Sequence, residues 1–372
     1  MSARFSELTT LRVGGPIADY KRLASRATLI KTARKTFESG AEWMVLGGGS
    51  NLVVSDEGFP GTVLHVVTKG RSLKYIDDDT VLLTVQAGEE WDGLVAYCVE
   101  EGFSGLESLS GIPGSVGASV IQNIGAYGHE VAEVLESIEF LDATSGEVST
   151  LDAIDLALGH RTSALKTGEM RGVVVSVTFR LKRSPLSLPV SYAELASQLG
   201  VSEGEVALSS TLREAVIALR RSKGMVLDEQ DVDSRSVGSF FVNPVVSEKF
   251  AYQLPTSAPK WFLDNPADQV VSLGESGTEV IKAPEAGMIN KAEPRVKLSA
   301  AWLIEHSGIG KGFSLPGSAV RVSTKHTLAI TNPDGGSAAE VGELARYIRT
   351  QVANKFGVIL QPEPVLEGID LG

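Results

Sequence analysis

Leu46-Gly47-Gly48-Gly49-Ser50-Asn51 is the stretch from which the interpretation of this chain starts. It follows a short apolar run, residues 43–46, that predicts a buried strand. Glycine lets a backbone approach a ligand closely, and successive N–H groups form a concave site that suits a pyrophosphate. A tight turn between two strands explains the same residues equally well. The stretch lacks the G-x-G-x-x-G spacing, so a nicotinamide-binding Rossmann site is poorly supported.

A second glycine-rich stretch, residues 111–128, favours a ligand more strongly. It holds five glycines and one proline among apolar residues. Small residues would let the chain press against a large flat ligand, while Ser115, Gln122 and Asn123 offer hydrogen-bonding groups. A long structural connection would not need those polar side chains. The candidate ligand contacts are Gly111, Pro113, Gly114, Ser115, Gly117, Ala118, Gln122, Asn123, Gly125, Ala126 and Tyr127.

Hydrophobic periodicity around these stretches predicts an α/β fold. We expect helices at residues 28–39, 90–101, 211–223, 299–307 and 338–356, and strands at residues 52–54, 63–67, 81–87, 137–142, 172–181 and 326–332. Cys98 lies on the apolar face of its predicted helix, which indicates core packing rather than a nucleophile. Residues 255–277, rich in Pro, Ser and Asp, are expected to form a long loop or insertion.

Composition narrows the class of protein. The chain has 372 residues, one cysteine and a formal net charge of -12, which argues against nucleic acid as a partner. We see neither an apolar run long enough to span a membrane nor the pattern of a secretory signal. The five histidines show no metal-ligand spacing, so no metal site is expected. The default expectation is a cytoplasmic monomer that acts on small molecules.

An anionic ligand would need a local cluster of cations in this acidic chain. Arg213, Arg220, Arg221 and Lys223 lie on or just after one predicted helix. They can meet a pyrophosphate, with Arg as a fork and Lys as a point charge. A solvated helical face accounts equally well for at least two of the four.

Together with further motifs, these stretches resemble the UDP-N-acetylenolpyruvoylglucosamine reductases, the MurB family. The resemblance runs in order from Thr9 to Glu363, nearly the whole chain. Besides the two glycine-rich stretches, it rests on residues 9–16, 160–163, 191–195, 238–244 (Gly-Ser-Phe-Phe-Val-Asn-Pro), 297–305 and 356–363. One such motif is weak, but this many in the same order form a specific signature.

The resemblance implies an FAD-dependent oxidoreductase of peptidoglycan precursor synthesis. NADPH would reduce FAD, and reduced FAD would pass a hydride to UDP-N-acetylglucosamine enolpyruvate, an enolpyruvyl ether of a UDP-sugar, giving UDP-N-acetylmuramate. FAD would contact the two glycine-rich stretches. Arg161 and Glu363 would polarise the substrate carboxylate, and Ser239 would donate the proton that quenches the carbanion. The implied substrate contacts are Tyr192, Arg220, Lys223, Asn243 and Glu305, while His306 stands where the family is expected to have Gln.

The implied fold is a two-lobed FAD-binding module of the vanillyl-alcohol-oxidase type, followed by a C-terminal α/β substrate-binding domain. We expect the first lobe at 1–67, with 361–372 returning to it, the second at 68–222, and the substrate-binding domain at 223–360.

Two alternatives remain open. One is an FAD oxidase or dehydrogenase of the same architecture acting on an alcohol or hydroxy acid. Many such enzymes attach the flavin through His or Cys, and neither stands near residues 47–51. The other is a non-catalytic sugar-nucleotide-binding protein, which would be expected to have lost Arg161 or Ser239.

Overall fold

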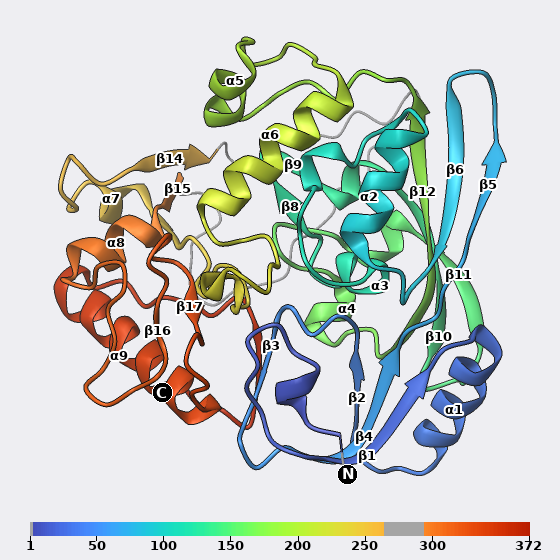
Figure 1. Cartoon of the computed structure of the whole chain (residues 1–372), viewed down its shortest axis with the longest axis horizontal. Coiled ribbons are helices and arrows are strands. Elements are labelled where there is room, and N and C mark those ends of the chain that lie inside the picture. The colour runs from blue at the N-terminus through green and yellow to red at the C-terminus, as the bar shows by residue number, and fades with distance from the viewer. Residues whose placement is uncertain (1–2, 264–293) are drawn as a thin grey trace.

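The computed structural model describes residues 3–263 and 294–372. Within these residues no helix combines the length and the apolar character needed to cross a membrane. Three groups of elements surround a central region in Figure 1: the blue N-terminal elements lie at the bottom, the green sheet at the right, and the orange and red C-terminal elements at the left.

The N-terminal group is a small parallel sheet with one covering helix. Strands β1 (Ile17–Leu23), β4 (Phe59–Val66) and β2 (Trp43–Leu46) pair in the order β1-β4-β2. Helix α1 (Arg26–Glu38) begins at Ser25, whose side chain accepts a hydrogen bond from the Thr28 amide. Its residues Leu29 and Ala33 are fully buried against the sheets.

The second group is a mainly antiparallel sheet with the order β11-β10-β12-β6-β5 and with β7 paired to β12. Its strands are β5 (Arg71–Tyr75), β6 (Thr80–Gln86), β7 (Phe103–Ser104), β10 (Leu135–Asp142), β11 (Val148–Asp152) and β12 (Gly172–Arg183). Helices α2 (Trp91–Glu100), α3 (Val116–Ser119) and α4 (Ala164–Thr167) accompany it. One hydrophobic core joins this sheet to α1, so the two groups pack as a unit.

Two helices extend this second group. Helices α5 (Ala193–Leu199) and α6 (Ser209–Ser222) pack on each other through Val190, Leu195, Ala196, Leu212, Ala215 and Val216. They lie at the top of Figure 1, away from the N-terminal sheet.

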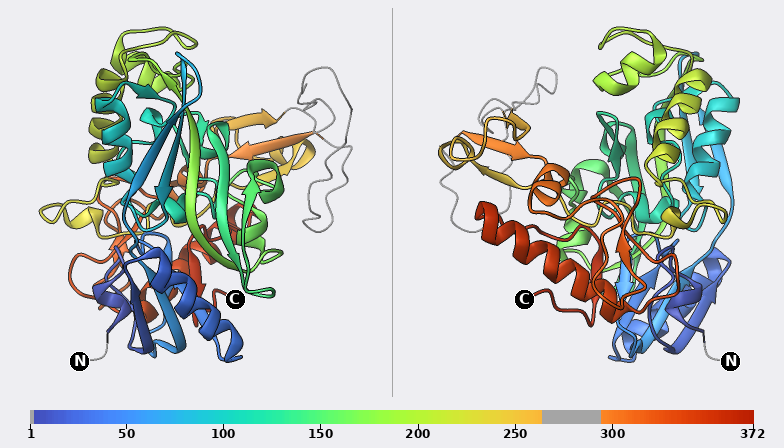
Figure 2. Two further views of the ribbon diagram at one scale, coloured as in Figure 1. Left: turned by 90° about the vertical axis from the view of Figure 1, so that its right-hand side faces the viewer. Right: turned by 60° about the vertical axis from the view of Figure 1, so that its left-hand side comes forward.

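The C-terminal group has its own core. The sheet β13-β15-β14 consists of Val245–Ser247, Arg295–Leu298 and Lys260–Leu263, and the hairpin β16–β17 of Arg321–Val322 and Ile330–Thr331. Helices α7 (Glu248–Ala251), α8 (Ala300–His306) and α9 (Ala338–Phe356) pack on them. Helix α9 starts with a capping box between Ser337 and Glu340 and ends at Gly357 in the left-handed conformation. Figure 2 shows α9 along the outer side of this group.

The last segment of the chain returns to the N-terminal group. Strand β18 (Val365–Glu367) pairs in parallel with β3 (Leu52–Val54), the strand that directly follows the first glycine-rich stretch. Just before it, residues 361–363 pair with the Phe240–Val242 segment. The tail therefore connects the C-terminal group to the first lobe.

The expected helices are confirmed to within two residues at each end, and Cys98 is buried in the core as expected. The strand expected at 326–332 is wrong in extent, because only Ile330–Thr331 pair and the preceding residues form turns. The long loop expected at 255–277 is wrong for Lys260–Leu263, which form β14, and its residues beyond 263 lie outside the described residues. Trp261 and Phe262 are consecutive and both exposed, so β14 lacks the alternation of buried and exposed residues by which a strand is predicted.

Candidate active site

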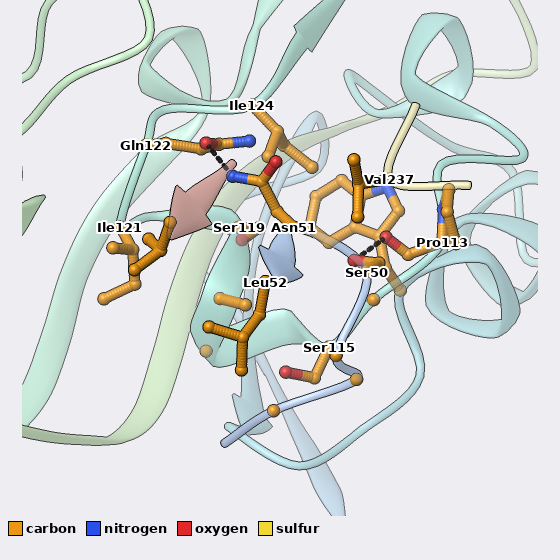
Figure 3. Close-up of a pocket in the computed structure, with 18 of the residues that line it drawn as sticks. Ser50, Asn51, Leu52, Pro113, Ser115, Ser119, Ile121, Gln122, Ile124 and Val237 are labelled. Carbon is orange, nitrogen blue, oxygen red and sulfur yellow. Dashed lines mark hydrogen bonds between the residues drawn. The ribbon is translucent and has the colours of Figure 1, made fainter. Parts of the chain in front are cut away.

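A cavity of about 700 Å³ lies where the three groups of elements meet. Its wall includes every residue of the first glycine-rich stretch, much of the second, and Arg161, Ser239 and Glu363. Figure 3 shows Ser50 and Asn51 facing Pro113 and Gln122 across one side of this cavity. The size falls in the range of about 300–1,000 Å³ that is usual for small-molecule and cofactor sites.

The two glycine-rich stretches lie against each other. A Cβ atom added at Gly48 would come within 2.7 Å of the Gly114 Cα atom, so only glycine fits there. Ser50 Oγ donates a hydrogen bond to the Pro113 carbonyl at 2.8 Å (Figure 3). Gly49 has φ +62°, a left-handed conformation that favours glycine. The stretches thus form one continuous backbone surface toward the cavity.

Asn51 forms hydrogen bonds that connect three distant parts of the chain. Its Nδ2 atom donates to Gln122 Oε1 at 2.6 Å and to the Glu363 carbonyl at 3.3 Å. The Asn51 carbonyl also accepts from the Val365 amide at 3.0 Å. Consequently the first lobe, the second lobe and the C-terminal tail share one hydrogen-bond network at the cavity wall.

Arg161 and Glu363 form an ion pair at this wall, with 3.4 Å between Nε and Oε1. Their side chains are only 26% and 14% exposed, so the pair is shielded from most of the solvent. Arg161 Nη2 also donates to the Gly125 carbonyl at 2.7 Å. Its backbone has φ +58° in the tight turn of residues 159–162, a conformation that costs about 1–2 kcal/mol for a residue other than glycine.

Ser239 lies close to this pair because two segments pair through their backbones. The Glu363 amide donates to the Phe240 carbonyl at 2.9 Å, and the Phe240 amide donates to the Leu328 carbonyl at 2.7 Å. Phe240 and Phe241 are fully buried and anchor the segment in the C-terminal core. The Ser239 hydroxyl has no hydrogen-bond partner within the described residues and lines the cavity.

The basic residues of α6 do not act as one cluster. Arg213 makes two hydrogen bonds to the Asp92 carboxylate, and Lys223 Nζ lies 2.7 Å from Glu194 Oε2 in α5. Arg220 lines the cavity, and its buried Nε atom has no hydrogen-bond partner among the described residues. Burial lowers the pKa of Arg220 from its ordinary value. A buried donor without a partner is costly, so this position is suited to a ligand acceptor.

Eight residues expected at the site do not line the cavity: Gly111, Asn123, Ala126, Tyr127, Tyr192, Lys223, Asn243 and Glu305. Tyr127 packs edge-on against Tyr192 with ring centroids 5.4 Å apart, and burial raises the pKa of Tyr127 to about 12. Asn243 Oδ1 accepts from the Ala300 amide at the start of α8. Glu305 accepts from Thr327, while His306 stacks on Trp302.

Among the wall residues that sequence reasoning did not single out are Lys166 and Val237. Lys166 Nζ lies 3.4 Å from Gln122 Oε1. Its place five residues after Arg161, in the same short segment, was the one signal that could have identified it.

The wall fits an FAD molecule. It offers a backbone surface without side chains at Gly47, Gly48 and Gly114, apolar residues such as Trp43 and Val174, and the donor of Arg220 that lacks a partner. In agreement, residues 20–152 match the model of the FAD binding domain. The class defined here is thus an FAD-dependent oxidoreductase with the two-lobed FAD-binding module and a separate C-terminal α/β domain.

Comparison with known proteins identifies the family. Residues 230–366 match the model of the UDP-N-acetylenolpyruvoylglucosamine reductase C-terminal domain. Proteins named UDP-N-acetylenolpyruvoylglucosamine reductase are 50% identical in Leifsonia xyli, over 98% of both chains, and 45% identical in Thermobifida fusca, over 98% of this chain and 97% of that one. This chain belongs to the UDP-N-acetylenolpyruvoylglucosamine reductase family.

A solved structure shows the same fold. The crystal structure of UDP-N-acetylenolpyruvylglucosamine reductase (MurB) from Thermus caldophilus superposes with a TM-score of 0.62 at 24% identity, covering 99% of this chain and 98% of that one.

Proposed function

We propose that this chain catalyses the NADPH-dependent reduction of UDP-N-acetylglucosamine enolpyruvate to UDP-N-acetylmuramate with bound FAD, a step of peptidoglycan precursor synthesis. The observation that carries the proposal is the meeting of Arg161, Glu363 and Ser239 on the wall of the cavity formed by both glycine-rich stretches. Family membership supports it, because the named relatives match over nearly their full lengths.

The glycine-rich stretches would hold the cofactor. The glycine backbones at Gly47, Gly48 and Gly114, which carry no side chains, suit its diphosphate, and Arg220 Nε suits an oxygen of the ligand. Bound FAD would supply two-electron redox chemistry between NADPH and the enolpyruvyl double bond.

Arg161, held in place by Glu363, would stabilise the negative charge that the reaction creates. Reduction of the terminal alkene carbon leaves negative charge on the adjacent carbon and its carboxylate. The Arg161 guanidinium, fixed by Glu363 and the Gly125 carbonyl, keeps further N–H groups for that carboxylate. Because its position is set before the reaction, it stabilises the developing charge without reorganisation.

Ser239 would provide the proton. Its hydroxyl has no partner among the described residues and stands beside the Glu363 segment. Serine is a weak acid, but an enolate is a strong base, so transfer is feasible when the two atoms are in hydrogen-bond contact. The proton forms the new C–H bond next to the carboxylate, and the serine oxygen regains a proton from solvent.

The nucleotide end of the substrate would lie between α5 and the C-terminal group. Lys223 would contact the diphosphate, Tyr192 would close over the nucleotide, and Asn243 and Glu305 would contribute further contacts. Lys223 must then leave Glu194, with which it is paired in this structure. We also expect a monomer in the cytoplasm; size-exclusion chromatography with light scattering tests the oligomeric state.

An anaerobic titration of the purified protein tests the function. NADPH should bleach the flavin absorbance, and UDP-N-acetylglucosamine enolpyruvate should restore it without oxygen. Bands that return only with oxygen would favour an FAD oxidase of the same architecture. A protein that stays colourless after addition of FAD would contradict both the reductase and the oxidase function.

A further inference from the structure

Lys166 is a cation at the cavity wall that the proposed mechanism leaves without a role. It lies in α4, which starts at Ser163: the Lys166 amide donates to Ser163 Oγ at 3.1 Å, and the Ser163 hydroxyl donates to the Ile121 carbonyl. Ser163 is buried, so α4 is fixed to the second glycine-rich stretch. The backbone position of Lys166 is thereby determined relative to Gln122, which follows Ile121.

No carboxylate lies within salt-bridge distance of Lys166 in the described part of the chain. The only hydrogen bond that its side chain makes there goes to the neutral Gln122 amide oxygen, at 3.4 Å, and that oxygen already accepts from Asn51 at 2.6 Å. Burial lowers the pKa of Lys166, the charge of Glu363 opposes this, and the charge of Arg161 adds to it. Arg161 and Glu363 are thus charged groups that act on the Lys166 ammonium group, and all three residues line the same cavity.

The charges of Lys166, Arg161 and Glu363 sum to one net positive charge. Arg161 and Glu363 neutralise each other as an ion pair, and Lys166 adds one uncompensated positive charge. Glu130 lies close to the Gly125 backbone, and its carboxylate is already engaged by Asn123 Nδ2 at 2.7 Å and His160 Nδ1 at 3.1 Å. A neutral Arg161–Glu363 pair cannot by itself balance a carboxylate, whereas the three groups together can.

We infer that Lys166 is a positioning residue that holds the carboxylate of the enolpyruvyl substrate beside the Arg161–Glu363 pair. This inference rests on the proposed function. The half-buried ammonium group, which lacks a carboxylate of its own, would exchange its weak contact with Gln122 for a charge-assisted bond to the substrate. It supplies the positive charge that the Arg161–Glu363 pair lacks, and this charge matters most as the carboxylate becomes an enolate.

The carboxylate dependence can be measured without turnover. Binding of UDP-N-acetylmuramate, which carries the carboxylate, and of UDP-N-acetylglucosamine, which does not, would be followed on the oxidised holoenzyme by calorimetry. Lys166→Met should weaken UDP-N-acetylmuramate by about 10- to 100-fold and leave UDP-N-acetylglucosamine within about 3-fold, the loss expected for one hydrogen bond to a charged group. Lys166→Arg should recover most of the difference.

A control variant separates the loss of the carboxylate contact from a general loss of positive charge. Lys31→Met removes an equal charge from the exposed face of α1 and should change neither affinity. Rapid-mixing kinetics should show Lys166→Met slowing flavin reoxidation by the enolpyruvyl substrate while reduction by NADPH changes little. Equal weakening of both sugar nucleotides, or no weakening, would overturn the inference.

Two further outcomes would distinguish failure of this inference from failure of the proposed function. Loss of flavin from both Lys166→Met and Lys166→Gln, with both variants still folded by circular dichroism, would assign the charge to FAD rather than to the substrate and would overturn the inference. A wild-type holoenzyme that the enolpyruvyl substrate does not reoxidise would instead contradict the proposed function itself.

Discussion

Replacing Ser239 by alanine separates proton transfer from every other property of the site. The Ser239 hydroxyl makes no hydrogen bond within the described residues, and the segment is held by the backbone bonds of Phe240 and by two buried phenylalanine rings. The substitution therefore removes no contact that stabilises the fold, and the free energy of unfolding should change by less than about 0.5 kcal/mol.

The effect on catalysis should be much larger. Positioned proton donors contribute roughly 10²- to 10⁴-fold to a rate, which corresponds to about 3–5 kcal/mol of activation free energy. Flavin reoxidation by the enolpyruvyl substrate should slow by that factor in Ser239→Ala. Flavin reduction by NADPH should stay within about 2-fold, because it needs no proton from Ser239.

Anaerobic rapid mixing, with each half-reaction followed by flavin absorbance, measures the two rates separately. Ser236→Ala is the matched control, since Ser236 lines the same cavity and its Oγ accepts from the Gly238 amide at 3.1 Å, but the proposed mechanism gives it no proton to transfer. It should lower the unfolding midpoint while both half-reactions remain near wild type. If Ser239→Ala slowed both half-reactions equally, or if Ser236→Ala matched its reoxidation defect, the proton-donor role would be refuted.

Three further predictions follow from individual contacts. Asn51→Leu removes the hydrogen bonds to Gln122 and to the Glu363 carbonyl. FAD affinity, measured by flavin fluorescence, and the unfolding midpoint should therefore both fall. Unchanged flavin affinity would contradict a role of this hydrogen-bond network in holding FAD. Glu194→Gln should lower KM for the UDP-sugar but not for NADPH by releasing Lys223, and a raised KM would show instead that the ion pair organises the site. Burial raises the pKa of Asp92, but hydrogen bonds from the Arg213 side chain and an amide outweigh it and hold this pKa below its usual range. The stability from Asp92 is thus full above the ordinary carboxyl pKa of about 3.9 and lost as pH falls through the lowered value; urea unfolding of Asp92→Asn should lack this acid-dependent loss.

Much of the fold could be predicted from local pattern. Helices α2 and α9 follow from apolar residues at helical spacing and from caps, such as Ser337 and Gly357, that act over a few residues. Strand β14 could not be predicted in this way, because Trp261 and Phe262 are exposed aromatic residues in a Pro- and Ser-rich context. Its pairing with β15 depends on residues more than thirty positions away.

The candidate site was predictable in kind but not in arrangement. Motif order pointed to Arg161, Ser239 and Glu363, and the tail pairing with Phe240 and Asn51 brings all three to one wall. The basic residues of α6 show the limit of sequence reasoning. Their place on or just after one helix suggested a shared anion site, yet Arg213 and Lys223 are each paired with a carboxylate from another element.

The sequence by itself determined the helices with strong periodicity, the two glycine-rich stretches, and the residue types needed for the chemistry. These are properties of short segments, since backbone conformation and side-chain chemistry act locally. Only the tertiary structure decided which charges are compensated: it pairs Arg161 with Glu363 and Lys223 with Glu194, and leaves Lys166 beside a neutral amide. Electrostatic compensation depends on distances between residues far apart in the chain, and no sequence spacing encodes those distances.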